Sequence, residues 1–77
     1  MDRPKELDIV VLRRALDEHG LKEADVGAVV HVYKGGSALD VEFVTGKGQT
    51  IAVVTLEQDA VRPMGGSEVL HARNLAV

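Results

Sequence analysis

Three histidines are the side chains of this 77-residue chain best suited to metal binding or to proton transfer near neutral pH. His19, His31 and His71 are 12 and 40 residues apart, and the chain contains no cysteine. A zinc site would need a carboxylate to complete it, and Glu42, on a strand next to His31, is the candidate. Histidines exposed on a strand, in a loop and near the C-terminus are the simpler interpretation, so we expect no metal.

Pairs of carboxylates are the second source of chemistry, because two of them held in a cleft can act as general acid and general base. The candidate pairs are Asp17 with Glu18, Glu23 with Asp25, and Asp40 with Glu42. Asp40 and Glu42 lie on the polar side of an alternating strand, which favours a solvated surface.

Motifs for nucleophilic catalysis and phosphate binding are missing from the sequence. Neither Ser37 nor Ser67 stands in a Gly-x-Ser-x-Gly elbow. Gly46-Lys47-Gly48 is too short for a phosphate-binding loop and precedes a strand rather than a helix. With no catalytic constellation, we expect a protein that is not an enzyme and that uses no cofactor.

Aromatic and basic residues limit the binding chemistry. The chain has one Tyr (Tyr33), one Phe (Phe43) and no Trp, whereas polyproline grooves and base-stacking platforms need several exposed rings. Twelve acidic residues against nine basic ones give a net charge of −3, which disfavours general nucleic-acid binding. A spatial cluster of Arg13, Arg14 and Arg62 would support the opposite conclusion.

The elements that position these residues belong to one small domain, since the mass is only 8.2 kDa. The absence of cysteine fits a reducing cytosol. No signal-peptide pattern opens the sequence and no apolar run approaches the length of a membrane span, so we expect a cytoplasmic protein without a membrane partner. No linker, low-complexity tract or internal repeat divides the chain.

Valine-rich apolar runs predict strands, because β-branched residues favour a pleated and half-buried surface. We expect strands over residues 8–13, 26–33, 38–44, 49–55 and 60–62.

The connections between these strands are predicted from glycines and proline. A Gly-Gly pair at 35–36 predicts a two-residue hairpin connection, and residues 45–48 predict a longer one. Residues 56–59 predict a tight turn, and Pro63 should end the last strand at a sheet edge. Residues 13–25 are expected to form a loop, with one helical turn ending at Gly20 as the alternative.

Five short antiparallel strands predict an all-β fold, a small five-stranded SH3-like barrel over residues 1–63, because closure removes exposed edges. Residues 64–77 are expected to form a C-terminal tail, either a short helix or an added strand.

Alternation assigns Phe43 to the core, together with Leu39 and Val41 on the same strand face. The strand 49–55 differs, because its apolar residues occupy both faces. Either the bending of a small barrel turns both faces inward, or one face contacts the tail or a partner chain. The expected partner-binding residues are Ala52, Val54, Val69, Leu70 and Leu75.

The order of these motifs resembles two groups of proteins. Asp25-Val26-Gly27 before the second strand resembles SH3-like barrels of the KOW type. Together with Glu18-His19-Gly20-Leu21 and Val41-Glu42-Phe43, it resembles more closely a family of small uncharacterised bacterial proteins, a domain of unknown function. The resemblance covers about residues 5–63 and implies a fold but no established activity. It also implies toxin-like or nuclease-like neighbours.

Physical roles follow for the matching positions. Gly27 is expected where strands approach closely, and Asp25 is expected to hydrogen-bond its own turn. Leu56 and Val61 flank the tight turn and are expected to plug the end of the barrel.

The sequence therefore predicts a protein-binding module, in its sharpest form an antitoxin-like or immunity-like protein that neutralises the product of a neighbouring gene. A KOW-like nucleic-acid or ribosome-associated module is the alternative. A homodimer is a further expectation.

Overall fold

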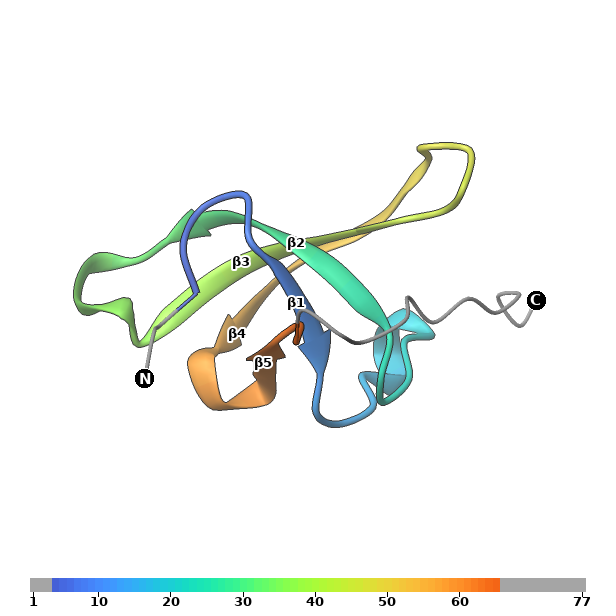
Figure 1. The fold of residues 1–77 in the computed structure, drawn as a ribbon. Coiled ribbons are helices and arrows are strands. Elements are labelled where there is room, and N and C mark those ends of the chain that lie inside the picture. Colours follow the sequence, from blue (N-terminus) through green and yellow to red (C-terminus); the bar gives the residue numbers. More distant parts are fainter. Residues whose placement is uncertain (1–3, 66–77) are drawn as a thin grey trace.

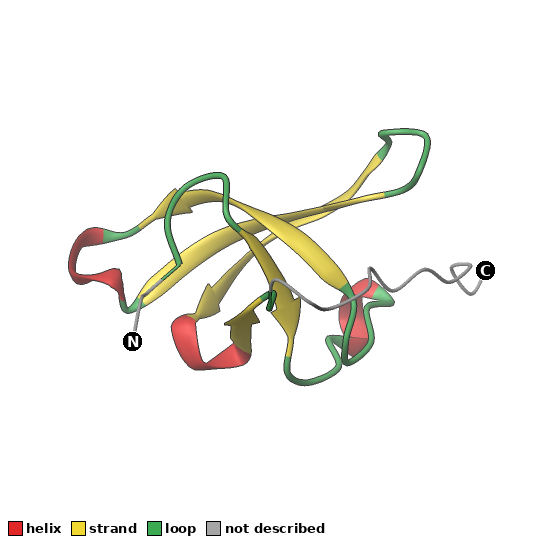
Figure 2. Cartoon of the chain, in the orientation of Figure 1, coloured by secondary structure: helices red, strands yellow, loops and turns green. Residues whose placement is uncertain are grey.

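The computed structural model describes residues 4–65 of the chain, which form one antiparallel sheet (Figure 1). The strands are β1 (Ile9–Leu12), β2 (Val26–Val32), β3 (Ala38–Val44), β4 (Thr50–Glu57) and β5 (Val61–Pro63). They are hydrogen-bonded in the order β4-β3-β2-β1-β5. Three short 3-10 segments, η1 (Asp17–His19), η2 (Lys34–Gly36) and η3 (Gln58–Ala60), lie in the connections (Figure 2). None of the helical segments in this described part is long and apolar enough to cross a membrane.

The prediction of an all-β fold with five antiparallel strands is confirmed. β4 and β5 are the two ends of the strand order, and η3 joins them directly. No β4–β5 ladder is formed within residues 4–65, so closure of the sheet into a barrel stays a prediction.

Two predicted turns differ from the structure. The connection between β2 and β3 covers residues 33–37 rather than two residues, because Gly35 and Gly36 both have positive φ (87° and 73°) inside the 3-10 turn η2. The predicted turn at 56–59 begins later, at Gln58, because Leu56 still pairs with Leu39 and is buried.

The segment between β1 and β2 is the expected loop. It also contains one short helical turn, η1, which the sequence offered as the alternative to a loop. η1 ends at Gly20, whose φ of 70° stops the turn. An isolated bridge joins Leu16 to Leu21, and Leu21 is buried in the core. The loop is therefore packed against the sheet rather than projecting from it.

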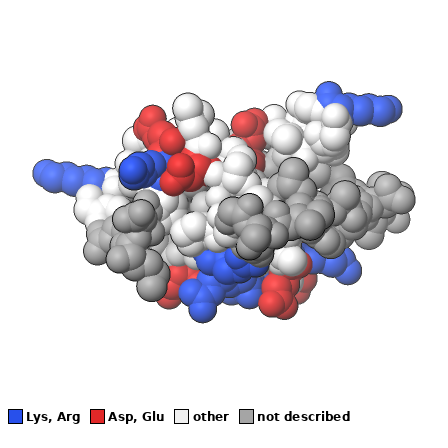
Figure 3. Space-filling view, in the orientation of Figure 1, with Lys and Arg blue, Asp and Glu red and all other residues white. Residues whose placement is uncertain are grey.

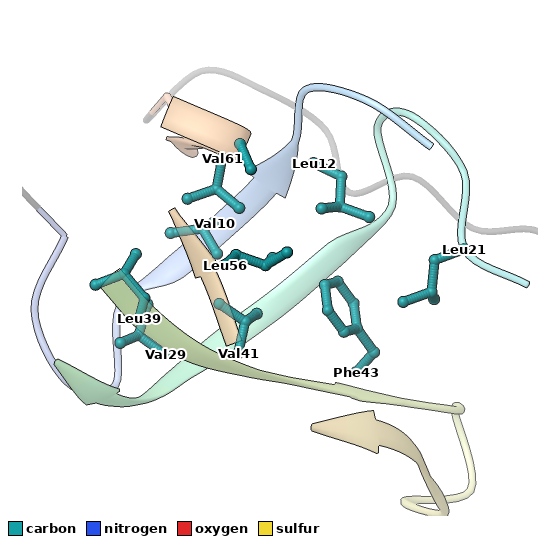
Figure 4. Close-up of a cluster of buried hydrophobic side chains, with 10 residues drawn as sticks. Val10, Leu12, Leu21, Val29, Leu39, Val41, Phe43, Leu56 and Val61 are labelled. Atoms are coloured by element: carbon teal, nitrogen blue, oxygen red, sulfur yellow. The ribbon is translucent and has the colours of Figure 1, made fainter. Parts of the chain in front are cut away.

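The core lies on one side of the sheet, where all five strands and the β1–β2 loop contribute apolar side chains that point toward one another (Figure 4). Phe43 belongs to this core, and so do Leu56 and Val61 at the β4–β5 junction. Its members are Val10, Leu12, Leu21, Val29, Leu39, Val41, Phe43, Leu56, Ala60 and Val61.

Gly27 in β2 lies directly against this core. A Cβ atom at Gly27 would come 2.6 Å from Val41 Cγ1, 2.9 Å from Phe43 Cε1 and 3.0 Å from the carbonyl oxygen of Glu42. These separations are shorter than carbon contacts allow, so β2 and β3 approach as closely as they do because residue 27 has no side chain.

Contrary to the expectation that the chain has no internal repeat, a short one organises the β1–β2 pair. Residues 5–12 (KELDIVVL) and 22–29 (KEADVGAV) share Lys, Glu and Asp at equivalent positions, 17 residues apart. In both copies the aspartate side chain accepts a hydrogen bond from the backbone N–H three residues earlier: Lys5 N to Asp8 Oδ2 at 2.8 Å, and Lys22 N to Asp25 Oδ2 at 2.9 Å. Asp25, which is buried, thus bonds its own turn.

The backbone hydrogen bonds between the two copies follow a local twofold relationship. Leu7 N donates to Val29 O, and Ala24 N donates in the same way to Leu12 O. Each turn therefore precedes one strand and is hydrogen-bonded to the other strand, at Val29 within β2 and at Leu12 at the end of β1, which fixes the β1–β2 register.

Candidate interaction surface

The face of the sheet opposite the core, called the outer face below, is defined by strand register. Ile9, Ala28, Glu42 and Val53 form one row across four strands. His31, Asp40 and Thr55 form the next row across three strands. The outer face thus combines apolar and acidic side chains.

Asp40 is the centre of a hydrogen-bond network on this face. Its carboxylate accepts a hydrogen bond from Thr55 Oγ1 at 2.5 Å and another from the Tyr33 hydroxyl at 2.9 Å. The His31 ring packs edge-on against Tyr33, with 4.6 Å between the ring centres. The Thr55 hydroxyl, supported by the Tyr33 hydroxyl and the charge of His31, holds the pKa of Asp40 below its usual value against the opposing effect of desolvation.

Glu42 is the second carboxylate of the outer face, and it accepts a hydrogen bond from Thr50 Oγ1 at 2.8 Å. Asp40 and Glu42 therefore bond different threonine hydroxyls of β4, and Asp40 also bonds the Tyr33 hydroxyl. Such a pair can present fixed negative charge to a partner, whereas acid–base chemistry needs two carboxylates with separated pKa values in a common site.

Exposed apolar side chains occupy neighbouring strand positions, since Val30 directly precedes His31, the residue that pairs with Asp40. Leu7 is 83% exposed, Ile9 43% and Val30 42%. Ile9 pairs with Ala28, and Leu7 is hydrogen-bonded to Val29, next to Val30, so the three belong to the same end of the β1–β2 pair. These residues, here called the Leu7 patch, were not among the predicted site residues. The repeated KE-x-D turn is the sequence signal that could have indicated Leu7.

The structure places the two expected contact residues of β4 on the side of the sheet that faces the core, and their role in partner binding stays a prediction. Ala52 and Val54 pair with Phe43 and Val41 and lie on the core side of β4, where both are half-buried and Val54 packs against the core. Val53 is the residue that faces outward, and it is 54% exposed. The other expected contact residues, Val69, Leu70 and Leu75, lie outside the described residues, as does His71.

Basic side chains form a second feature at the other end of the sheet. Arg13 and Arg62 line a pocket of about 300 Å³, together with Val11, Leu12, Glu23 and Ala24. Two of the three arginines considered above are thus brought together, while Arg14 does not line this pocket. Figure 3 shows basic side chains gathered along the lower edge of the molecule with acidic ones on either side, so positive charge does not dominate this face.

The remaining candidates for chemistry are dispersed. His19 lies in η1, whereas His31 and Glu42 belong to different rows of the outer face. Within residues 4–65, no three His, Asp or Glu side chains come together as a possible metal-ligand set.

The fold and this surface define a small, single-sheet β domain with a mixed apolar and acidic outer face. The chain belongs to a family described as a domain of unknown function, DUF4926, whose family model matches residues 6–63. That range contains all five strands and the Leu7 patch. No significant match was found among curated proteins or among solved structures.

Proposed function

We propose that this protein is a protein-binding module that engages its partner through the outer face of the sheet. The observation that carries the proposal is the Leu7 patch next to the Asp40 network. Apolar side chains exposed together on a small protein are typical of contact sites, and here Val30 directly precedes His31, which pairs with Asp40, a carboxylate whose negative charge is stabilised.

The mechanism is occlusion. The Leu7 patch would supply the apolar centre of the interface, and Asp40 would face a basic group of the partner. The most specific version of this proposed function is antitoxin-like or immunity-like neutralisation in the cytoplasm. The product of a neighbouring gene is then the first candidate partner. The resemblance to small uncharacterised bacterial proteins with toxin-like or nuclease-like neighbours favours this form.

The test compares baits that differ at one exposed apolar residue. Wild type, Leu7→Ser and Val44→Ser are used to capture proteins from the native host, followed by quantitative mass spectrometry. Val44 is 50% exposed but belongs to the β3–β4 hairpin, so it controls for the loss of any exposed apolar side chain. A true partner is depleted by Leu7→Ser and retained by Val44→Ser.

The purified partner then gives the decisive measurement, which is the dissociation constant by calorimetry. We expect Leu7→Ser and Asp40→Asn each to weaken binding at least tenfold and Val44→Ser to leave it unchanged. Equal affinity for all four proteins would contradict the proposed surface.

A nucleic-acid or ribosome-associated role is the second candidate, favoured by the proximity of Arg13 and Arg62 in one pocket. Glu23 in the same pocket and the net charge of −3 weigh against it. An affinity that is lost in Arg13→Ala and Arg62→Ala but kept in Leu7→Ser would favour this role over the first.

A further inference from the structure

The two edges of the sheet differ in how well they are protected against another strand. β5 has only three residues and ends at Pro63, which lacks a backbone N–H. β4 has eight residues, and within residues 4–65 it pairs with β3 alone. Its sequence, TIAVVTLE, contains no proline, lysine or arginine, the residues that usually block an edge strand.

We propose that a second copy of this chain adds to the β4 edge, antiparallel to the first β4, so that the two sheets become continuous. This inference is independent of the proposed function, because it uses the β4 edge and not the Leu7 patch. A sheet edge offers unpaired backbone donors and acceptors, which a second strand can satisfy.

Self-complementarity identifies the second copy as the occupant. In an antiparallel pair, opposed residues lie on the same face. A twofold axis between two copies of β4 must therefore pass midway between one residue of β4 and the same residue of the other copy. With the axis at Val53, each Ala52 opposes Val54 of the other copy, and both of these residues lie on the core side of β4. The one charged residue of the strand, Glu57, then lies at opposite ends of the two copies, so no like charges are opposed.

The exposure of Val53 supports the same conclusion. Val53 is 54% exposed on the outer face, and an opposed valine would cover part of that apolar surface. One strand edge buries less than the roughly 800 Å² per partner of a standard interface, so we expect a weak dimer that forms at high protein concentration.

The first test is the concentration dependence of the sedimentation coefficient for the full chain. Val53→Lys should weaken dimerisation at least fivefold, because lysine is unfavourable on a paired edge. The matched control is Val44→Lys, which places the same charge at a similarly exposed valine of β3, a strand with neighbours on both sides. Equal thermal unfolding of the two variants shows that both are folded.

The second test uses the absence of cysteine from the chain, which makes single-cysteine variants unambiguous. Cysteines are introduced one at a time at positions 52, 53, 54 and 55, with Val44→Cys as the control, and oxidised at high concentration. Cross-linking should peak at one β4 position, the residue on the axis, because only that residue opposes itself at a distance a disulfide can bridge. A monomer at all concentrations, uniform cross-linking along β4, or equal cross-linking of Val44→Cys would each overturn the proposal.

Discussion

Leu7 and Ala24 occupy equivalent positions in the two KE-x-D turns and share a left-handed backbone, with φ of 74° and 76°. They are the two non-glycine residues with positive φ in the described chain. A left-handed conformation costs an ordinary L-residue roughly 1–2 kcal/mol, which the hydrogen bonds of each turn must offset. Leu7 is the more unusual of the two, because a large apolar side chain there is also exposed.

Glycine at these positions should therefore stabilise the fold. We expect Leu7→Gly and Ala24→Gly each to raise the free energy of unfolding by up to about 1 kcal/mol, since relief of the left-handed strain exceeds the added chain entropy. Urea denaturation measures the change. If the Leu7 patch binds a partner, Leu7→Gly alone should weaken that binding, while Ala24→Gly serves as the matched control.

Gly27 should tolerate no side chain. We expect Gly27→Val to lower the free energy of unfolding by about 1–3 kcal/mol, because its Cβ would overlap Val41 and Phe43. Gly46→Val is the control: its Cβ would meet nothing within 4 Å. Similar melting temperatures for the two variants would argue against a close approach at Gly27.

A second substitution separates this overlap from a backbone effect. Val41→Ala removes the nearest clashing atom and should recover part of the stability lost in a Gly27→Ala variant. A double-mutant cycle measures that coupling, and strictly additive effects would mean that Gly27 matters for another reason.

Asp40 should make the stability of the sheet sensitive to acid. Because its folded pKa lies below the unfolded value, ionised Asp40 contributes stability above the unfolded pKa of about 3.9, and that stability is lost as pH falls through the folded pKa. Asp40→Asn should have a shallower dependence of melting temperature on pH between about 2 and 5. Parallel curves for variant and wild type would show that the Thr55 and Tyr33 hydrogen bonds do not stabilise the carboxylate.

Generic RNA and DNA should not bind at physiological salt, because the chain carries a net charge of −3 and Glu23 lines the pocket that contains Arg13 and Arg62. Fluorescence anisotropy with labelled single- and double-stranded oligonucleotides checks this. Tight binding that weakens steeply between low and moderate salt would instead favour the nucleic-acid role.

Local patterns in the sequence predicted much of this fold. Alternation in residues 38–44 assigned Phe43 to the core, and glycines predicted where hairpins turn, because side-chain period and positive φ are properties of a few adjacent residues. The approach of strands at Gly27 was also predictable, since a glycine within an apolar strand indicates a close neighbour.

Only the tertiary structure decided which residues meet on the outer face. The irregularity between Phe43 and Val44 sets the β3–β4 register, in which Ala52 and Val54 lie toward the core and Val53 faces outward. A similar irregularity between Val29 and His31 places His31 opposite Asp40, and the β3–β4 register places Thr55 on its other side. Strand register depends on contacts between distant segments, and a shift of one residue exchanges the two faces of a strand, so composition and spacing alone do not determine it.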